Sequence, residues 1–132
     1  MLLFLLLSTV AAKITNCGST RALFKLNTAG FWPDPAVRNG NSTVSLDYTV
    51  PDGLTVLDGK VTYTVTYNFI PLSPSTEPLC TQTVTCPIKS GTYNTSTSTT
   101  FPDVSGSLHV KAEWKDTADN LLLCYSISTS TR

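Results

Sequence analysis

Apolar and polar residues alternate strictly over several stretches of this chain, and beyond its first residues no stretch shows apolar residues at helical spacing. The clearest case is 60–69, in which every second residue is aliphatic or aromatic. Because side chains alternate between the two faces of a β-strand, such a stretch predicts a strand with one apolar face. Three further stretches and one shorter candidate show the same pattern: 44–50, 108–115, 121–128 and 20–27.

Turn-forming residues separate these stretches. They occur at Pro51-Asp52-Gly53, Asp58-Gly59, Ser90-Gly91, Ser105-Gly106 and Asp119-Asn120. The Thr/Ser tract 92–100 fits an edge strand or an O-glycosylated loop, and we favour the strand. A single solvated sheet cannot cover six or seven strands that each carry an apolar face. The pattern therefore predicts an all-β, immunoglobulin-like sandwich of two sheets.

Composition narrows the function more than the fold. The chain has 132 residues, the size of one domain, and its nine basic and nine acidic residues cancel. Nucleic-acid binding requires a basic excess or a basic stripe, and neither is present, so no nucleic-acid partner is expected. Polarity comes instead from hydroxyl groups, with 22 Thr and 14 Ser.

The first twelve residues, MLLFLLLSTVAA, read as a targeting segment. An unbroken apolar run is followed by small residues, with Val10 and Ala12 at the −3 and −1 positions of a signal-peptidase site. The run is much shorter than the roughly 20 residues that a spanning helix needs. The sequence therefore predicts a signal peptide at 1–12 and one domain at 13–132, which is expected to be monomeric.

Four cysteines suit an oxidising compartment. Four allow three pairings, and the short separation of Cys80 and Cys86 suits a local bridge, which leaves Cys17 to pair with Cys124. A zinc site is disfavoured because the chain has one histidine and the cysteine spacing is wrong, so no metal and no cofactor are expected. Two N-glycosylation sequons, at Asn41 and Asn94, fit the same compartment.

Two connections are more apolar than solvated turns usually are. They are 69–74, with the sequence FIPLSP, and 101–104, with the sequence FPDV. They could frame an apolar mouth between the sheets or simply plug the end of the core. A third segment, 30–35, places Phe31 and Trp32 in a loop, where we expect them to cap the core rather than touch a ligand.

Catalysis finds little support. His109 has the polar parity of its strand, which predicts an exposed side chain rather than a catalytic base. Glu113 shares that face with Lys111 and Lys115, a pattern typical of a cross-strand salt-bridge surface. The remaining acids, mostly aspartates in turns, form no paired inward carboxylates, and there is no nucleophile elbow. We expect no enzymatic activity.

Several short motifs together resemble one known family. They are Cys17-Gly18, Glu77-Pro78-Leu79-Cys80, Cys86-Pro87-Ile88, the stretch LHVKAEWKD at 108–116, and Leu123-Cys124. This set is similar to the ML lipid-recognition domain family, which includes the soluble Niemann-Pick type C sterol-transfer protein, dust-mite group 2 allergens and fungal phosphatidylglycerol/phosphatidylinositol transfer proteins. The resemblance implies a sandwich whose sheets hold a lipid between them, and it supports both cysteine pairs. The sterol-transfer members have a third, early disulfide, whereas 31–40 contains no cysteine here.

The resulting hypothesis is a carrier, secreted or in the endosomal or lysosomal lumen, that holds a sterol or phospholipid in an apolar cavity between two sheets. Its partners would be that lipid and either a membrane, met transiently, or a membrane-protein acceptor. The expected lining is Leu46, Tyr48, Val50, Tyr63, Val65, Tyr67, Phe69, Leu108, Val110 and Trp114, with Ile70, Leu72, Phe101 and Val104 at the mouth. The alternative is a filled immunoglobulin-like module that binds a protein or a glycan through its surface.

Overall fold

A computed structural model of the chain describes residues 13–33, 37, 39–82, 84–100 and 106–131. The predicted signal peptide and the predicted mouth residues Phe101 and Val104 lie outside these ranges.

Two antiparallel sheets make up the fold. The larger sheet contains β1 (Lys13–Asn16), β4 (Gly59–Tyr67), β5 (Ile70–Pro71), β6 (Ser75–Pro78), β8 (Gly106–Asp116) and β9 (Leu121–Thr131). The smaller sheet contains β2 (Lys25–Trp32), β3 (Asn41–Val50) and β7 (Gly91–Thr100). One short helix, α1 (Leu79–Gln82), follows β6. The two-sheet sandwich expected from the alternation is confirmed.

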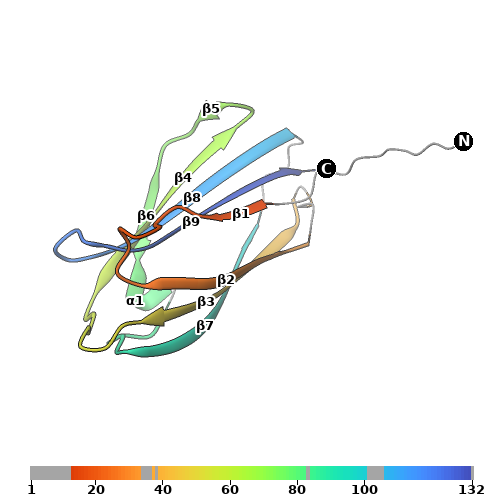
Figure 1. Cartoon of the computed structure of the whole chain (residues 1–132). Coiled ribbons are helices and arrows are strands. Elements are labelled where there is room, and N and C mark those ends of the chain that lie inside the picture. The colour runs from red at the N-terminus through yellow and green to blue at the C-terminus, as the bar shows by residue number, and fades with distance from the viewer. Residues whose placement is uncertain (1–12, 34–36, 38, 83, 101–105, 132) are drawn as a thin grey trace, which may run out of the picture.

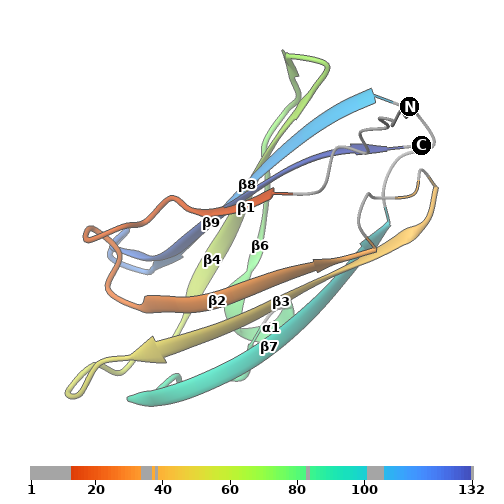
Figure 2. The ribbon, with the colours of Figure 1, turned by 45° about the vertical axis from the view of Figure 1, so that its right-hand side comes forward.

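The edge strands β6, of the larger sheet, and β7, of the smaller sheet, lie on the same side of the sandwich. The larger sheet runs β1-β9-β8-β4, and both β5 and β6 pair with the free side of β4. In the smaller sheet β3 lies between β2 and β7. Figures 1 and 2 show these sheets as two layers, which are closest where β4 begins and diverge toward the end where it finishes.

The alternating stretches correspond to the long strands, and the strand predicted at 92–100 is confirmed as the edge strand β7. The three short strands β1, β5 and β6, of two to four residues, are additional to the six or seven expected. They are too short for a period of two to be visible in the sequence.

The strand predicted at 20–27 is displaced toward the C-terminus. β2 begins at Lys25, and the amides of Leu23 and Phe24 donate hydrogen bonds to the carbonyls of Leu121 and Leu122 in the other sheet. Residues 18–24 therefore cross from one sheet to the other. Because β2 extends to Trp32, Phe31 and Trp32 belong to a strand, and their assignment to a loop was wrong.

A packed half of the sandwich lies where the sheets are closest. Tyr48 stacks on Phe24, with ring centroids 5.6 Å apart, and meets Trp114 edge-on at 5.3 Å. Val61 and Leu79 are fully buried in the same cluster. Aromatic pairs at these separations add about 0.5–1.5 kcal/mol each to the free energy gained from burial, so this half anchors the fold.

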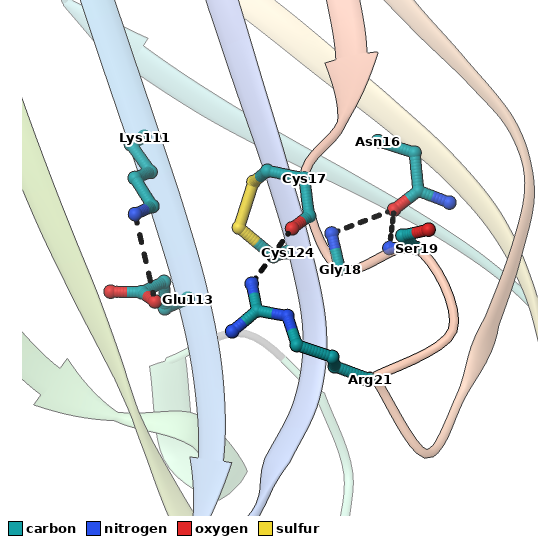
Figure 3. The surroundings of a disulfide bond; sticks show 8 residues. All are labelled: Asn16, Cys17, Gly18, Ser19, Arg21, Lys111, Glu113 and Cys124. Carbon is teal, nitrogen blue, oxygen red and sulfur yellow. Dashed lines mark hydrogen bonds and ion pairs between the residues drawn. A yellow bond between two sulfur atoms is a disulfide. The ribbon is translucent and has the colours of Figure 1, made fainter.

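Both predicted disulfides are present. Cys17 and Cys124 join the end of β1 to β9, with Cα atoms 5.0 Å apart, and Cys80 and Cys86 close a short loop, with Cα atoms 5.2 Å apart. Figure 3 shows that the turn after Cys17 is further held by the Asn16 side-chain oxygen, which accepts hydrogen bonds from the amides of Gly18 and Ser19. The long-range bridge thus fixes the point where the chain leaves the larger sheet.

Across the described ranges, no helix is both long and apolar enough to cross a membrane.

Candidate functional site

A cavity of about 350 Å³ lies between the two sheets, beyond the packed half. Its lining comes from both sheets: Phe31, Val44, Tyr63, Val65, Ser75, Glu77, Thr97, Ser98, Thr100, Leu108, Val110, Tyr125 and Ile127. Small-molecule sites in proteins typically measure about 300–1,000 Å³. The cavity is therefore large enough to be a ligand site.

The apolar walls of the cavity are set by strand register. Val65 on β4 pairs with Val110 on β8, and Val110 pairs with Ile127 on β9, so the three side chains form one row on the inner face of the larger sheet. Leu108, two residues before Val110 on β8, belongs to the next row of inward-facing side chains, and Phe31 from the smaller sheet packs against it. The small cluster around Leu108 adjoins the main cluster, and Phe31 packs against both.

The serine, threonine and glutamate residues of the lining come only from the two edge strands β6 and β7. Ser75 and Glu77 belong to β6, and Thr97, Ser98 and Thr100 belong to β7. We call these five residues the polar seam. Ser75, Ser98 and Thr100 are exposed, whereas Glu77 and Thr97 are half-buried. The cavity thus has apolar walls on its inner strands and a hydroxyl-rich side that reaches solvent.

Two tyrosines and a glutamate form a cluster on the cavity wall. The Tyr63 hydroxyl donates a hydrogen bond to Oε1 of Glu77 at 3.3 Å. Tyr63 pairs with Ala112, which pairs with Tyr125, so only a small side chain separates the two rings across the sheet. Burial raises the pKa of Tyr125 well above its usual range, and the charges of Tyr63 and Glu77 raise it further. The Tyr125 phenol therefore stays protonated at neutral pH.

Among the described residues that line the cavity, Glu77 carries the one formal charge, and no lysine, arginine or histidine is present. The described part of the chain also holds no group of three or more His, Cys, Asp or Glu that could bind a metal. The arrangement therefore suits a mostly apolar ligand with a small polar group and provides no candidate metal centre.

A strained apolar hairpin stands beside the cavity. β4 and β5 are joined by Asn68 and Phe69, whose φ angles of 48° and 67° are both positive. Asn-Gly is the usual sequence for this turn, and a bulky residue at positive φ is disfavoured. Phe69 is 89% exposed and the adjacent Ile70 is 61% exposed. Asn68 also exchanges hydrogen bonds with the backbone of Ser107, which ties the hairpin to the start of β8.

Comparison with known proteins decides the family, because a family model described as the ML domain matches residues 11–131. The chain belongs to the ML domain family.

Individual relatives agree with this assignment. A Dictyostelium discoideum protein, named as a candidate phosphatidylglycerol/phosphatidylinositol transfer protein 2, is 32% identical over 109 residues, which are 80% of this chain and 75% of the relative. Two solved structures share the fold. A Niemann-Pick type C2 protein from Japanese carpenter ant has a TM-score of 0.71 at 15% identity, covering 91% of this chain and 99% of that chain. Chicken MD-1 complexed with lipid IVa has a TM-score of 0.60 at 10% identity, covering 89% and 86%.

Only part of the expected lining surrounds the cavity of this ML domain. Tyr63, Val65, Leu108 and Val110 line it, and Tyr67 packs in the Leu108 cluster beside it. Phe69, Ile70 and Leu72 are exposed on the hairpin and the segment that follows it.

Four residues of the expected lining lie in the packed half instead: Leu46, Tyr48, Val50 and Trp114. They have the inner parity of their strands, as expected, but they occupy the part of each strand where the two sheets are in contact. Tyr48 also borders a second depression, of about 380 Å³, beside β7. These four residues therefore lie in the core and not among the side chains that line the cavity.

Further lining residues were not expected. Val44, Tyr125 and Ile127 have inner parity on strands that the alternation identified, so the same pattern could have found them. Phe31 was assigned to a loop because prolines follow it closely. Glu77 lies on a four-residue strand with no visible alternation, and no sequence signal marked it as a lining residue.

The remaining predicted surface features are placed as follows. His109 is exposed, and its Nδ1 lies 2.9 Å from the Ser128 hydroxyl. Glu113 pairs with Lys111 of its own strand at 3.9 Å, so this ion pair is not a cross-strand one (Figure 3). Asn41 and Asn94, the two sequon asparagines, are exposed on β3 and β7.

Proposed function

We propose that this ML domain carries one lipid molecule, a sterol or a phospholipid, in the cavity between its sheets and exchanges it with membranes. The observation that carries the proposal is the 350 Å³ cavity, whose inner walls are apolar along three neighbouring strands. A cavity of this size favours a carrier over a filled immunoglobulin-like module. The names of the transfer-protein relative and of the MD-1 complex point in the same direction.

Lipid exchange of this kind needs no reactive group. Removing one methylene group from water contributes about 0.8 kcal/mol, so a bound chain is strongly held against escape into water. Against a bilayer the difference nearly vanishes, because the lipid moves from one apolar medium to another. The rate of exchange would then depend on contact between the mouth of the cavity and the membrane surface.

The β4–β5 hairpin is the proposed membrane contact. Phe69 combines an unfavourable backbone conformation with nearly full exposure of an aromatic ring, two costs that the isolated domain does not recover. Inserting the ring into a lipid interface would recover about 1.5–3 kcal/mol. Trp32, which is also exposed, follows the cavity residue Phe31 at the end of β2 and could add a second contact.

Export to an oxidising compartment fits this role. Two closed disulfides support a secreted or lumenal location, and we propose that 1–12 is removed as a signal peptide. The exposure of Asn41 and Asn94 is compatible with glycosylation of either sequon. We expect the mature domain to act as a monomer.

Uptake and transfer of fluorescent lipids test the proposal. Purified protein incubated with vesicles that contain a fluorescent sterol or phospholipid should bind about one lipid per chain. It should then deliver that lipid to acceptor vesicles. Absence of uptake for both lipid classes would refute the carrier.

A further inference from the structure

The cavity is chemically one-sided, and this bears on which lipid head group it accepts. Its serine, threonine and glutamate residues all lie on the polar seam of the edge strands β6 and β7, whereas the inner strands supply aliphatic side chains and the hydroxyl-bearing rings of Tyr63 and Tyr125. A lipid in the cavity would therefore place its tail among the inner strands and its polar group at the seam. Glu77 of the seam adjoins Tyr63 and Tyr125 of the inner strands, and these three residues form the cluster described above.

Glu77 makes this end of the cavity an acceptor of hydrogen bonds. Its carboxylate is half-buried, it receives the hydrogen bond from Tyr63, and the described residues show no ion pair to it. A carboxylate has several lone pairs, so one hydrogen bond from Tyr63 leaves capacity for another donor. An unpaired negative charge beside an apolar cavity is costly, and a ligand donor would offset that cost.

Tyr125 adds a donor on the same cavity wall, within electrostatic reach of Glu77. The residue is 4% exposed, and burial together with Tyr63 and Glu77 keeps the phenol in its protonated form. A ligand group that fits the cluster should therefore both donate to Glu77 and accept from Tyr125.

We infer that the polar end of the bound lipid is an uncharged hydroxyl group, which donates to Glu77 and accepts from Tyr125 at the seam. This inference rests on the proposed function. A hydroxyl is both donor and acceptor, so it satisfies both partners at once. An ammonium group gains the attraction of the Glu77 carboxylate but has no lone pair for the phenol proton, so it leaves the buried Tyr125 donor without an acceptor. A fatty-acid carboxylate can accept from Tyr125 but is repelled by Glu77, with no cation in the described lining to compensate.

Three single-chain lipids that differ only at the head group provide the test: 1-hexadecanol, hexadecanoate and hexadecylamine. Each is titrated at pH 7.5 against protein loaded with Nile red, an uncharged dye, and displacement gives its affinity. The alcohol should bind at least about tenfold more tightly than the acid and more tightly than the amine.

Glu77→Gln keeps the size of the side chain and its hydrogen-bond acceptor but removes the charge, so the preference for alcohol over acid should shrink severalfold. Glu113→Gln is the matched control, since it removes the same charge from the outer face of the same sheet and should leave the preference unchanged. Tyr125→Phe should weaken binding of the alcohol severalfold, because the donor is lost.

Equal binding of acid and alcohol, tighter binding of the amine, or an unchanged preference in Glu77→Gln would each overturn the inference while leaving the carrier function intact. If none of the three lipids binds and fluorescent sterol and phospholipid also fail to bind, the proposed function itself is refuted, and the inference with it. Thermal melts of each variant verify folding before the titrations are compared.

Discussion

Substitutions at two valines of one strand can distinguish the cavity from the packed half of the sandwich. Val61 and Val65 lie on the same face of β4, four residues apart, but Val61 is fully buried in the packed half and Val65 lines the cavity. Replacing each with Trp adds the same volume in two different surroundings. We predict opposite outcomes for the two substitutions.

The magnitudes follow from the cost of empty space. Void volume in a closed protein interior costs roughly 24 cal/mol per Å³, so 350 Å³ would correspond to about 8 kcal/mol, an upper bound because the polar seam of this cavity reaches solvent. If the indole of Val65→Trp fills on the order of 100 Å³, the free energy of unfolding should rise by up to about 2 kcal/mol. Val61→Trp forces extra atoms into close packing and should lower the free energy of unfolding by about 1–3 kcal/mol.

Chemical denaturation of the lipid-free proteins measures both changes, and the fluorescent-lipid assay measures binding. Val65→Trp should remain as stable as the parent protein or become more stable, and it should lose at least about tenfold in lipid affinity because the indole occupies the site. Equal destabilisation by the two substitutions would refute the reasoning, since it would mean that the sheets are as tightly packed around Val65 as around Val61.

Other consequences can be measured independently. Removing the long-range disulfide with Cys17→Ala and Cys124→Ala should lower the free energy of unfolding by up to about 5 kcal/mol, because it opens a loop with a sequence separation of 107 residues; an unchanged denaturation midpoint would contradict this. Because folding raises the pKa of Tyr125, its contribution to the free energy of unfolding is fully present below about pH 10, the pKa of an unfolded tyrosine. Above that pH the contribution is lost, by up to about 1.4 kcal/mol per pH unit. In Tyr125→Phe the decline of stability measured above pH 10 should therefore be less steep, and an identical slope would argue against a buried phenol. Phe69→Ser should slow lipid transfer between vesicles severalfold without changing equilibrium binding. Leu57→Ser should leave the transfer rate unchanged, because this exposed leucine lies just before the start of β4, at the end of the strand opposite the hairpin. Equal rates for Phe69→Ser and the parent protein would exclude the hairpin as the contact.

Alternation along the chain was sufficient to predict the sandwich and the inward faces of β3, β4, β8 and β9. It misplaced β2, and β7 was predicted from its Thr and Ser content instead. Alternation could not predict how far apart the sheets lie at each position. Val61 and Val65 illustrate the limit, because they are the same residue type on the same face, and only the divergence of the two sheets places one in the core and the other at the cavity.

The polar side of the site was less predictable still. Glu77 lines the cavity because β6 pairs with the free side of β4, a long-range pairing of four residues that leaves no periodic signal in the sequence. The strand position of Phe31 was missed for another reason. The prolines that follow it indicate a loop, but its pairing with Val44 keeps it in β2. Local patterns therefore identified the inward faces of long strands, although not every lining residue on them, and gave no signal for the lining residues that depend on edge pairing.

Native mass spectrometry of the protein after incubation with phospholipid and sterol vesicles tests the central claim most directly. The account predicts a mass increase equal to one lipid per chain, and it predicts that Val65→Trp, folded and equally pure, shows the lipid-free mass. A lipid-free mass for the parent protein, or the same lipid adduct on the parent protein and on Val65→Trp, would contradict a lipid held between the two sheets.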